Sequence, residues 1–122
     1  MTFVDFNYKM VIAIRSDLKL SKSKIAVYAS HVSVLAVEEA KKKRSDWLKK
    51  WFSEGQKKVV VQVSTELELE TLYQKAINEN LPCGFVNEYN QENKSKEIIA
   101  AVAIGPTPNT KIDKFTADLK LL

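Results

Sequence analysis

The stretch "YKMVIAIRSDLKLSKSKIAVYASHV", residues 8–32, decides the fold. Its first eight residues form a compact apolar run, which is typical of a strand covered on both faces. Ser21 can then cap a helix that runs to about Arg44, because its hydroxyl can accept a hydrogen bond from a free N–H of the first turn. The positions that recur at helical spacing and should face the sheet are Ile25, Ala29, Val32 and Ala36.

Downstream of this unit, the chain continues to alternate between helices and strands. Residues 45–55, "SDWLKKWFSEG", predict a short helix, and residues 57–63, "KKVVVQV", predict a second strand. Trp47 and Trp51 lie four residues apart on one side of that helix. Core packing or a dimer surface is therefore expected for them, rather than base stacking.

A third helix and two more strands follow. Thr65 and Glu68 fit a capping box for the helix, which should end before Pro82. Its expected apolar stripe is Leu69, Leu72, Tyr73, Ala76 and Ile77. Residues 83–89 and 97–105 predict the third and fourth strands, the "GPTP" segment is expected to turn the chain, and the tail supplies a last short helix.

This order of elements predicts a single α/β domain over residues 1–122. A sheet with helices on both faces and right-handed crossovers is expected. Residues 87–97, "NEYNQENKSKE", form the only long polar break between apolar strands, so they should be a surface loop. The sequence contains neither a GxGxxG motif nor a P-loop, and nucleotide cofactors therefore have no support.

The composition is that of an ordinary globular protein: of 122 residues, 45% are hydrophobic and 28% are charged. No apolar run approaches the roughly 18 residues that a membrane span needs, and residues 10–14 are too short for the core of a signal peptide. The single Cys83 favours a reducing cytosol. One cysteine and one histidine supply too few soft ligands for a metal site.

The charge is basic, with nineteen Lys and Arg residues against fifteen Asp and Glu, a net charge of +4 and a pI near 9.1. This excess of positive charge is compatible with nucleic-acid binding but does not demonstrate it. The lysines beside the second helix could widen a basic face, although solvated side chains are the default expectation. They are Lys49, Lys50, Lys57 and Lys58.

The start of the first helix is the candidate anion site. Lys22 and Lys24 lie in or just before its first turn, where cations are unfavourable because the helix N-terminus already carries about half a positive charge. Lysines and backbone N–H groups that converge there create a place for a phosphate. The alternative is that these lysines are solvated and never converge.

His31, the only histidine, follows Lys24 by seven residues. Two helical turns separate them, so the two side chains share one face about 10 Å apart along the axis, with Tyr28 between them. They could flank a substrate. The alternative is a histidine at the edge of the core, bonded to a backbone carbonyl.

Three separated segments, in order, carry a resemblance to a known family: "KMVIAIRSDLKLSKSKIAVYASH", "LKKWFSEGQKKVVVQV" and the ending "AIGPTP…IDKFTADLKLL". They resemble the archaeal and eukaryotic (type II) peptidyl-tRNA hydrolases over residues 9–122. The resemblance implies a cytoplasmic three-layer α/β/α sandwich with a four-stranded mixed sheet, typically a homodimer. It also implies hydrolysis of the ester that joins a peptide to tRNA, without metal or cofactor.

The same resemblance implies roles for particular residues. Lys22 and Lys24 match the two lysines of the family's K-G-K stretch, and His31 matches its helix histidine. Arg15, Asp17 and Lys19 match its first loop, and Arg15, Lys19 and Lys22 are the implied tRNA-binding residues. Lys24 would hold a tRNA phosphate or the developing oxyanion, and His31 would orient or deprotonate the attacking water.

Several positions depart from the family pattern. Its loop after the third strand is roughly D-A-G-x-T-Q, whereas this chain has Glu88 at the Asp, Asn90 at the Gly, Glu92 at the Thr and Asn93 at the Gln. Glu88 keeps a carboxylate and is the third implied catalytic residue, with His31 and Lys24. Asn90 can still adopt a left-handed turn. Glu92 places a charge near tRNA phosphate.

Three substitutions lie on the helix side of the site. Serines, Ser21 and Ser23, replace glycines near the lysines, and Tyr28 replaces a Gln. Three interpretations follow from these departures: a working peptidyl-tRNA hydrolase, weakened by its loop; a catalytically degenerate homologue that retains RNA binding; and a dimeric scaffold without a role in RNA.

Overall fold

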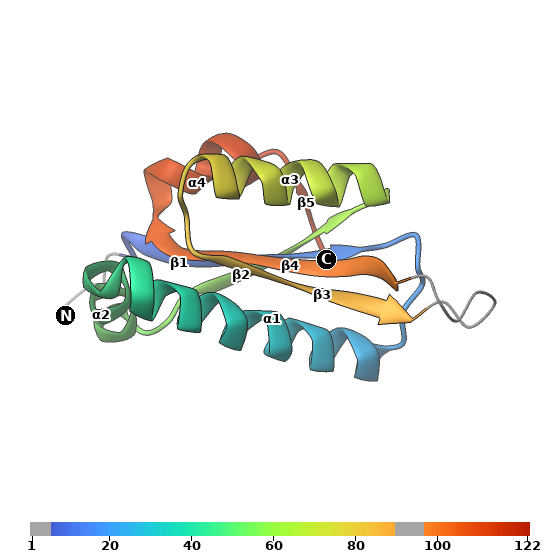
Figure 1. Cartoon of the computed structure of the whole chain (residues 1–122), viewed down its shortest axis with the longest axis horizontal. Helices are drawn as coiled ribbons and strands as arrows, with labels where there is room; N and C mark the ends of the chain where they lie inside the picture. The colour runs from blue at the N-terminus through green and yellow to red at the C-terminus, as the bar shows by residue number, and fades with distance from the viewer. Residues whose placement is uncertain (1–5, 90–96) are drawn as a thin grey trace.

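The computed structural model describes residues 6–89 and 97–122. The chain alternates between strands and helices, as the sequence predicts (Figure 1). The elements are β1 (Tyr8–Arg15), α1 (Lys22–Lys43), α2 (Ser45–Glu54), β2 (Lys58–Val63), α3 (Glu66–Asn78), β3 (Cys83–Tyr89), β4 (Glu97–Pro108), α4 (Asn109–Thr116) and β5 (Lys120–Leu121).

The sheet is mixed and has five strands in the order β3-β4-β1-β2-β5. Strands β1 and β2 are parallel, and the remaining neighbours are antiparallel. The expected number of four strands is wrong by one, because the chain end adds the two-residue β5 to the edge of β2, where Lys120 pairs with Gln62. So short an edge strand has no apolar alternation that a sequence pattern could reveal.

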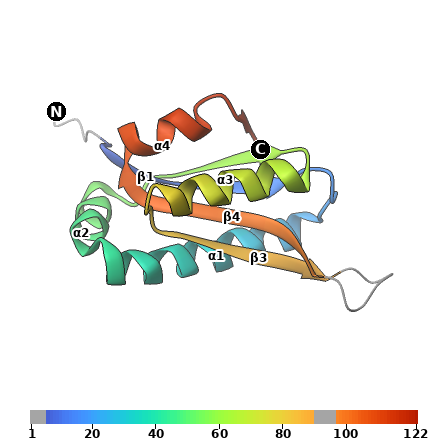
Figure 2. The same ribbon diagram turned by 45° about the horizontal axis from the view of Figure 1, so that its top comes forward.

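Helices cover both faces of the sheet: α1 and α2 lie on one face, and α3 and α4 lie on the other (Figures 1 and 2). The residues of β1 alternate between the two cores. Met10, Ile12 and Ile14 pack on the α1 and α2 side, whereas Val11 and Ala13 pack on the side of α3 and α4. Burial on both faces explains why the strand is a continuous apolar run.

Helix α1 lies close against β3, the edge strand. A Cβ atom added at Gly84 would lie 2.6 Å from Cβ of Leu35, so only glycine permits this approach. The contact places the N-terminal half of α1 beside the last residues of β3. The end of this edge strand and the start of α1 therefore lie side by side.

Strand β4 continues through the "GPTP" segment, so the turn expected there is wrong. Thr107 and Pro108 still pair with Lys9 and Tyr8, after a register shift in β1 between Lys9 and Val11. Gly105 makes this possible, because its φ is +116° and an added Cβ would lie 2.6 Å from the carbonyl oxygen of Lys9. A bulge thus accommodates the irregular backbone that the sequence pattern predicted as a turn.

Local expectations for the helices mostly hold. Ser21 caps α1, and Thr65 Oγ1 accepts from the backbone N–H of Glu68. Trp47 and Trp51 are buried in the core, as predicted, whereas Ile77 is exposed. In the described part of the chain, none of the helices has the combination of length and apolar character that crossing a membrane requires.

Candidate active site

The candidate site lies where the N-terminus of α1 meets the end of β3 (Figure 1). The helix begins after Ser21, whose Oγ accepts a hydrogen bond of 3.2 Å from the backbone N–H of Lys24. The first turn contains no acidic residue that would neutralise its lysines. Lys22 is exposed there, and Lys19 lies just before it with a φ of +50°.

Lys24 forms an ion pair with Glu88 of β3. Its Nζ lies 3.3 Å from Oε2 and 3.4 Å from Oε1 of the carboxylate. The lysine side chain is 51% exposed, whereas that of Glu88 is only 14% exposed. The ammonium group is thus accessible to a ligand from solvent, beside a carboxylate that the fold holds nearly buried.

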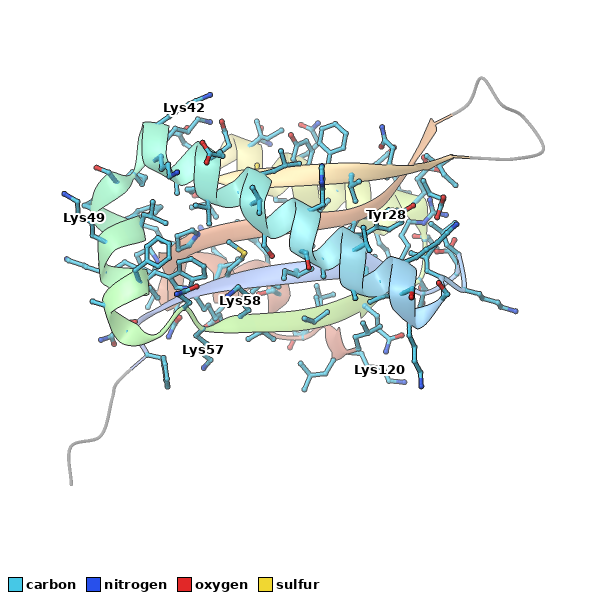
Figure 3. The ribbon with its side chains drawn as sticks, turned by 90° about the horizontal axis from the view of Figure 1, so that it is seen from below. Tyr28, Lys42, Lys49, Lys57, Lys58 and Lys120 are labelled. Atoms are coloured by element: carbon cyan, nitrogen blue, oxygen red, sulfur yellow. The ribbon has the colours of Figure 1, made fainter. Side chains whose placement is uncertain are left out.

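Tyr28 lies one helical turn beyond Lys24 and completes the cluster. Its hydroxyl donates a hydrogen bond to Glu88, and burial together with this contact raises the pKa of Tyr28 above its usual range. The hydroxyl therefore stays protonated and acts as a donor at neutral pH. Figure 3 shows Tyr28 on the half of α1 remote from α2. No sequence pattern indicates this role directly, although a spacing of four residues predicts that Tyr28 and Lys24 are neighbours on the helix surface.

Arg15, at the end of β1, is engaged inside the protein. It is 7% exposed, and its guanidinium makes paired hydrogen bonds of 3.0 and 2.7 Å to Asp17. Its Nη1 donates to the carbonyl oxygen of Ile99 and lies 3.9 Å from Glu66. Hydrogen bonding from Arg15 lowers the pKa of Asp17, so the pair is ionised and stiffens the loop before α1.

His31 is exposed on α1, where it lines a shallow hollow with apolar and small neighbours on the same helix. These neighbours are Ala26, Val27, Ser30 and Val34. Of the predicted site residues that lie within residues 6–89 and 97–122, Lys24 and Glu88 are in direct contact, and Tyr28 joins them through Glu88. Asn90 and Glu92, two of the loop positions that depart from the family pattern, lie outside the described residues.

The fold and the site define a class of protein. It is an α/β protein in which an accessible lysine and a shielded carboxylate meet at a helix N-terminus, an arrangement suited to an anionic substrate and to water. In the described ranges, no three His, Cys, Asp or Glu side chains are grouped so that they could hold a metal ion.

A family model described as Peptidyl-tRNA hydrolase PTH2 matches residues 8–122, and the chain belongs to this family. Its curated relatives include three archaeal proteins, each named peptidyl-tRNA hydrolase. The protein of Methanocaldococcus jannaschii is 43% identical over 93% of this chain and 99% of its own length. That of Thermococcus sibiricus is 42% identical over 96% and 99%, and that of Staphylothermus marinus is 41% identical over 94% and 95%. Nothing in these comparisons favours a degenerate or scaffold protein.

Proposed function

We propose that this protein hydrolyses the ester bond of peptidyl-tRNA and releases free tRNA and peptide. The observation that carries the proposal is the family match over nearly the whole chain, together with relatives at 41–43% identity that bear the name of this activity. In the reaction, water adds to the ester carbonyl and gives up a proton, the bond between the carbonyl carbon and the ribose oxygen breaks, and that oxygen leaves as a hydroxyl after taking up a proton.

The cluster at the helix N-terminus supports a division of roles. The Glu88 carboxylate accepts a hydrogen bond from the attacking water and so orients it, while Tyr28 holds the carboxylate in place. The Lys24 ammonium lies beside this carboxylate and is accessible, so it stabilises negative charge as it develops on the carbonyl oxygen.

The remaining predicted residues have roles outside this cluster in the proposal. Lys19 and Lys22 are exposed and contact phosphates of the tRNA. The guanidinium of Arg15 is buried and its donors are occupied within the protein. Arg15 therefore contributes through Asp17, by holding the loop before α1 in place. His31 is the second candidate for handling the water or a substrate proton, from the face of α1 that carries Lys24.

Two further properties are proposed from the family resemblance: a homodimeric state and a cytoplasmic location. Val27 and Val34 on α1 are each 61% exposed and offer apolar surface that a second copy could cover. Sedimentation at micromolar concentration tests the dimer, and a purely monomeric mass contradicts it.

Fractionation of cells that express the protein tests the proposed location. Protein found outside the cytoplasmic fraction contradicts it.

Release of tRNA from purified peptidyl-tRNA tests the activity. The native protein should release tRNA at the same rate with and without EDTA. Lys24→Ala should lower the rate by about 10²-fold, as loss of a positioned charge stabiliser does. Lys75→Ala removes an exposed lysine of α3 on the far layer and should leave the rate unchanged. No release by the native protein would refute the proposed function.

A further inference from the structure

The excess positive charge of the protein is concentrated in one segment. Residues 38–58 contain eight of the nineteen Lys and Arg residues and four of the fifteen Asp and Glu residues. The rest of the chain is balanced, with eleven of each sign. The entire net charge of +4 is therefore that of 21 consecutive residues, which span the end of α1, helix α2 and the start of β2.

These residues gather at the end of the molecule remote from the candidate active site. Figure 3 shows Lys42, Lys49, Lys57 and Lys58 around α2, whereas Tyr28 lies toward the opposite end of α1. Lys24 and Lys42 are 18 residues apart in one helix, which corresponds to about 27 Å along its axis. A single ligand that contacts both regions must be long.

The carboxylates at this end are already engaged. Glu38 pairs with Lys41, Glu39 with Lys43 and Asp46 with Arg44, at 3.0, 3.0 and 2.8 Å. Glu54 accepts from the backbone N–H groups of Asn7 and Tyr8. In the part of the chain that the structure describes, five exposed lysines of the segment have no ion-pair partner: Lys42, Lys49, Lys50, Lys57 and Lys58.

Aromatic rings underlie three of these five lysines. The ammonium groups of Lys50, Lys57 and Lys58 lie 5.7, 5.5 and 5.0 Å from the ring centroids of Tyr8, Phe6 and Trp51. Cation–π attraction of this kind restrains an otherwise free side chain. The rings thus hold positive charge on a defined face, where it attracts a polyanion more strongly than the same charge spread over the surface.

We propose that the five unpaired lysines, here called the α2 lysine face, bind backbone phosphates of the double-stranded part of the tRNA. This inference rests on the proposed function. With the peptidyl ester held at Lys24 and Glu88, the helical arm that follows the 3′ end runs along α1 and reaches α2. RNA helices are contacted largely through phosphates and shape, which suits lysines without base-specific partners. The face therefore distinguishes an intact tRNA from its short 3′ end.

A matched pair of triple variants tests the inference by tRNA binding. One variant carries Lys49→Gln, Lys50→Gln and Lys57→Gln. The control carries Lys75→Gln, Lys111→Gln and Lys120→Gln, which remove equal charge from α3, α4 and β5. Fluorescence anisotropy with intact tRNA is measured over a range of salt concentrations. The log–log slope should become shallower by about 0.7–0.9 per lost phosphate contact, hence by about 2 to 3 in the first variant and little in the control.

A second substrate separates this inference from the proposed function. On a peptidyl ester of a short single-stranded 3′ oligonucleotide, the first variant should match the native protein, whereas on intact peptidyl-tRNA its KM should rise at least 10-fold. If the native protein hydrolyses neither substrate, the proposed function is refuted. The salt dependence of tRNA binding still tests whether the α2 lysine face contacts phosphates. Equal slopes for the two variants, with matching melting curves, overturn the inference. The inference is also overturned if the first variant loses a dimer while its slope is unchanged, because the α2 lysine face would then be a contact between two copies of the protein.

Discussion

Replacing Tyr28 by phenylalanine removes one hydroxyl from the candidate active site and leaves the ring in place. In the native protein this hydroxyl donates to Glu88, while Lys24 pairs with the same carboxylate. Without the donor, the carboxylate loses one of the contacts that set its orientation. We therefore expect a lower kcat with little change in KM, because the lost interaction positions a reacting group rather than binding the tRNA.

The magnitude follows from the burial of the pair. A hydrogen bond to a charged group contributes about 1.5–3 kcal/mol when it is shielded from water. Glu88 is 14% exposed, but its other partner Lys24 is 51% exposed, so water can partly replace the lost donor. The expected loss is about 1–2 kcal/mol, which corresponds to a fall in kcat of about 5- to 30-fold.

The assay is steady-state release of tRNA, measured for the native protein, Tyr28→Phe and Tyr28→Gln. Glutamine keeps an N–H donor at this position, so the kcat of Tyr28→Gln should lie closer to the native value. A double-mutant cycle with Glu88→Gln then tests whether Tyr28 acts through the carboxylate. In the Glu88→Gln background, loss of the hydroxyl should have little further effect on kcat.

Two results would refute this reasoning. If Tyr28→Phe retains native kcat while its melting curve is unchanged, the hydroxyl does not position a reacting group. If the effects of Tyr28→Phe and Glu88→Gln are additive in the cycle, the two residues act independently despite their contact.

Three other predictions concern single residues. His31→Ala should lower hydrolysis by about 10²-fold with tRNA affinity intact, and native activity in a folded variant would exclude His31 from the reaction. Asp17 has its pKa lowered from 3.8 by Arg15, so the stability it adds is present above about pH 4 and is lost as pH falls through its folded pKa. The free energy of unfolding of Asp17→Asn, measured in urea, should therefore differ from that of the native protein at pH 7 and converge toward it in acid. A difference that does not change with pH contradicts this prediction. Gly84→Ala should lower the free energy of unfolding by about 1–3 kcal/mol, because its Cβ would lie 2.6 Å from that of Leu35. Unchanged urea unfolding would show that α1 can move away from β3 without cost.

The features that the sequence predicts well are those determined within a few residues. The apolar run of β1 has its observed bounds Tyr8–Arg15, and Ser21 caps α1 as its position before the helix indicates. Lys22 and Lys24 lie in the first turn for the same reason. Apolar periodicity and capping are local physical requirements, so a single segment is enough to reveal them.

The local pattern was insufficient wherever a distant strand decided the outcome. The "GPTP" segment has the composition of a turn, yet it pairs with β1 through a bulge and extends β4 to Pro108. Strand β5 exists because the chain end meets β2. Ile77 fits the apolar stripe of α3, but its side chain is exposed.

The candidate site depends on tertiary structure most of all. The sequence by itself determined that lysines begin α1 and that a carboxylate ends β3, but these residues are 64 positions apart. They meet because α1 packs on the edge strand at Gly84, where the absence of a side chain lets the helix approach. The same packing shields the Glu88 carboxylate and brings Tyr28 to it. Electrostatic contacts between elements require this close approach in space, and a sequence pattern contains no distance between elements that are remote in the chain.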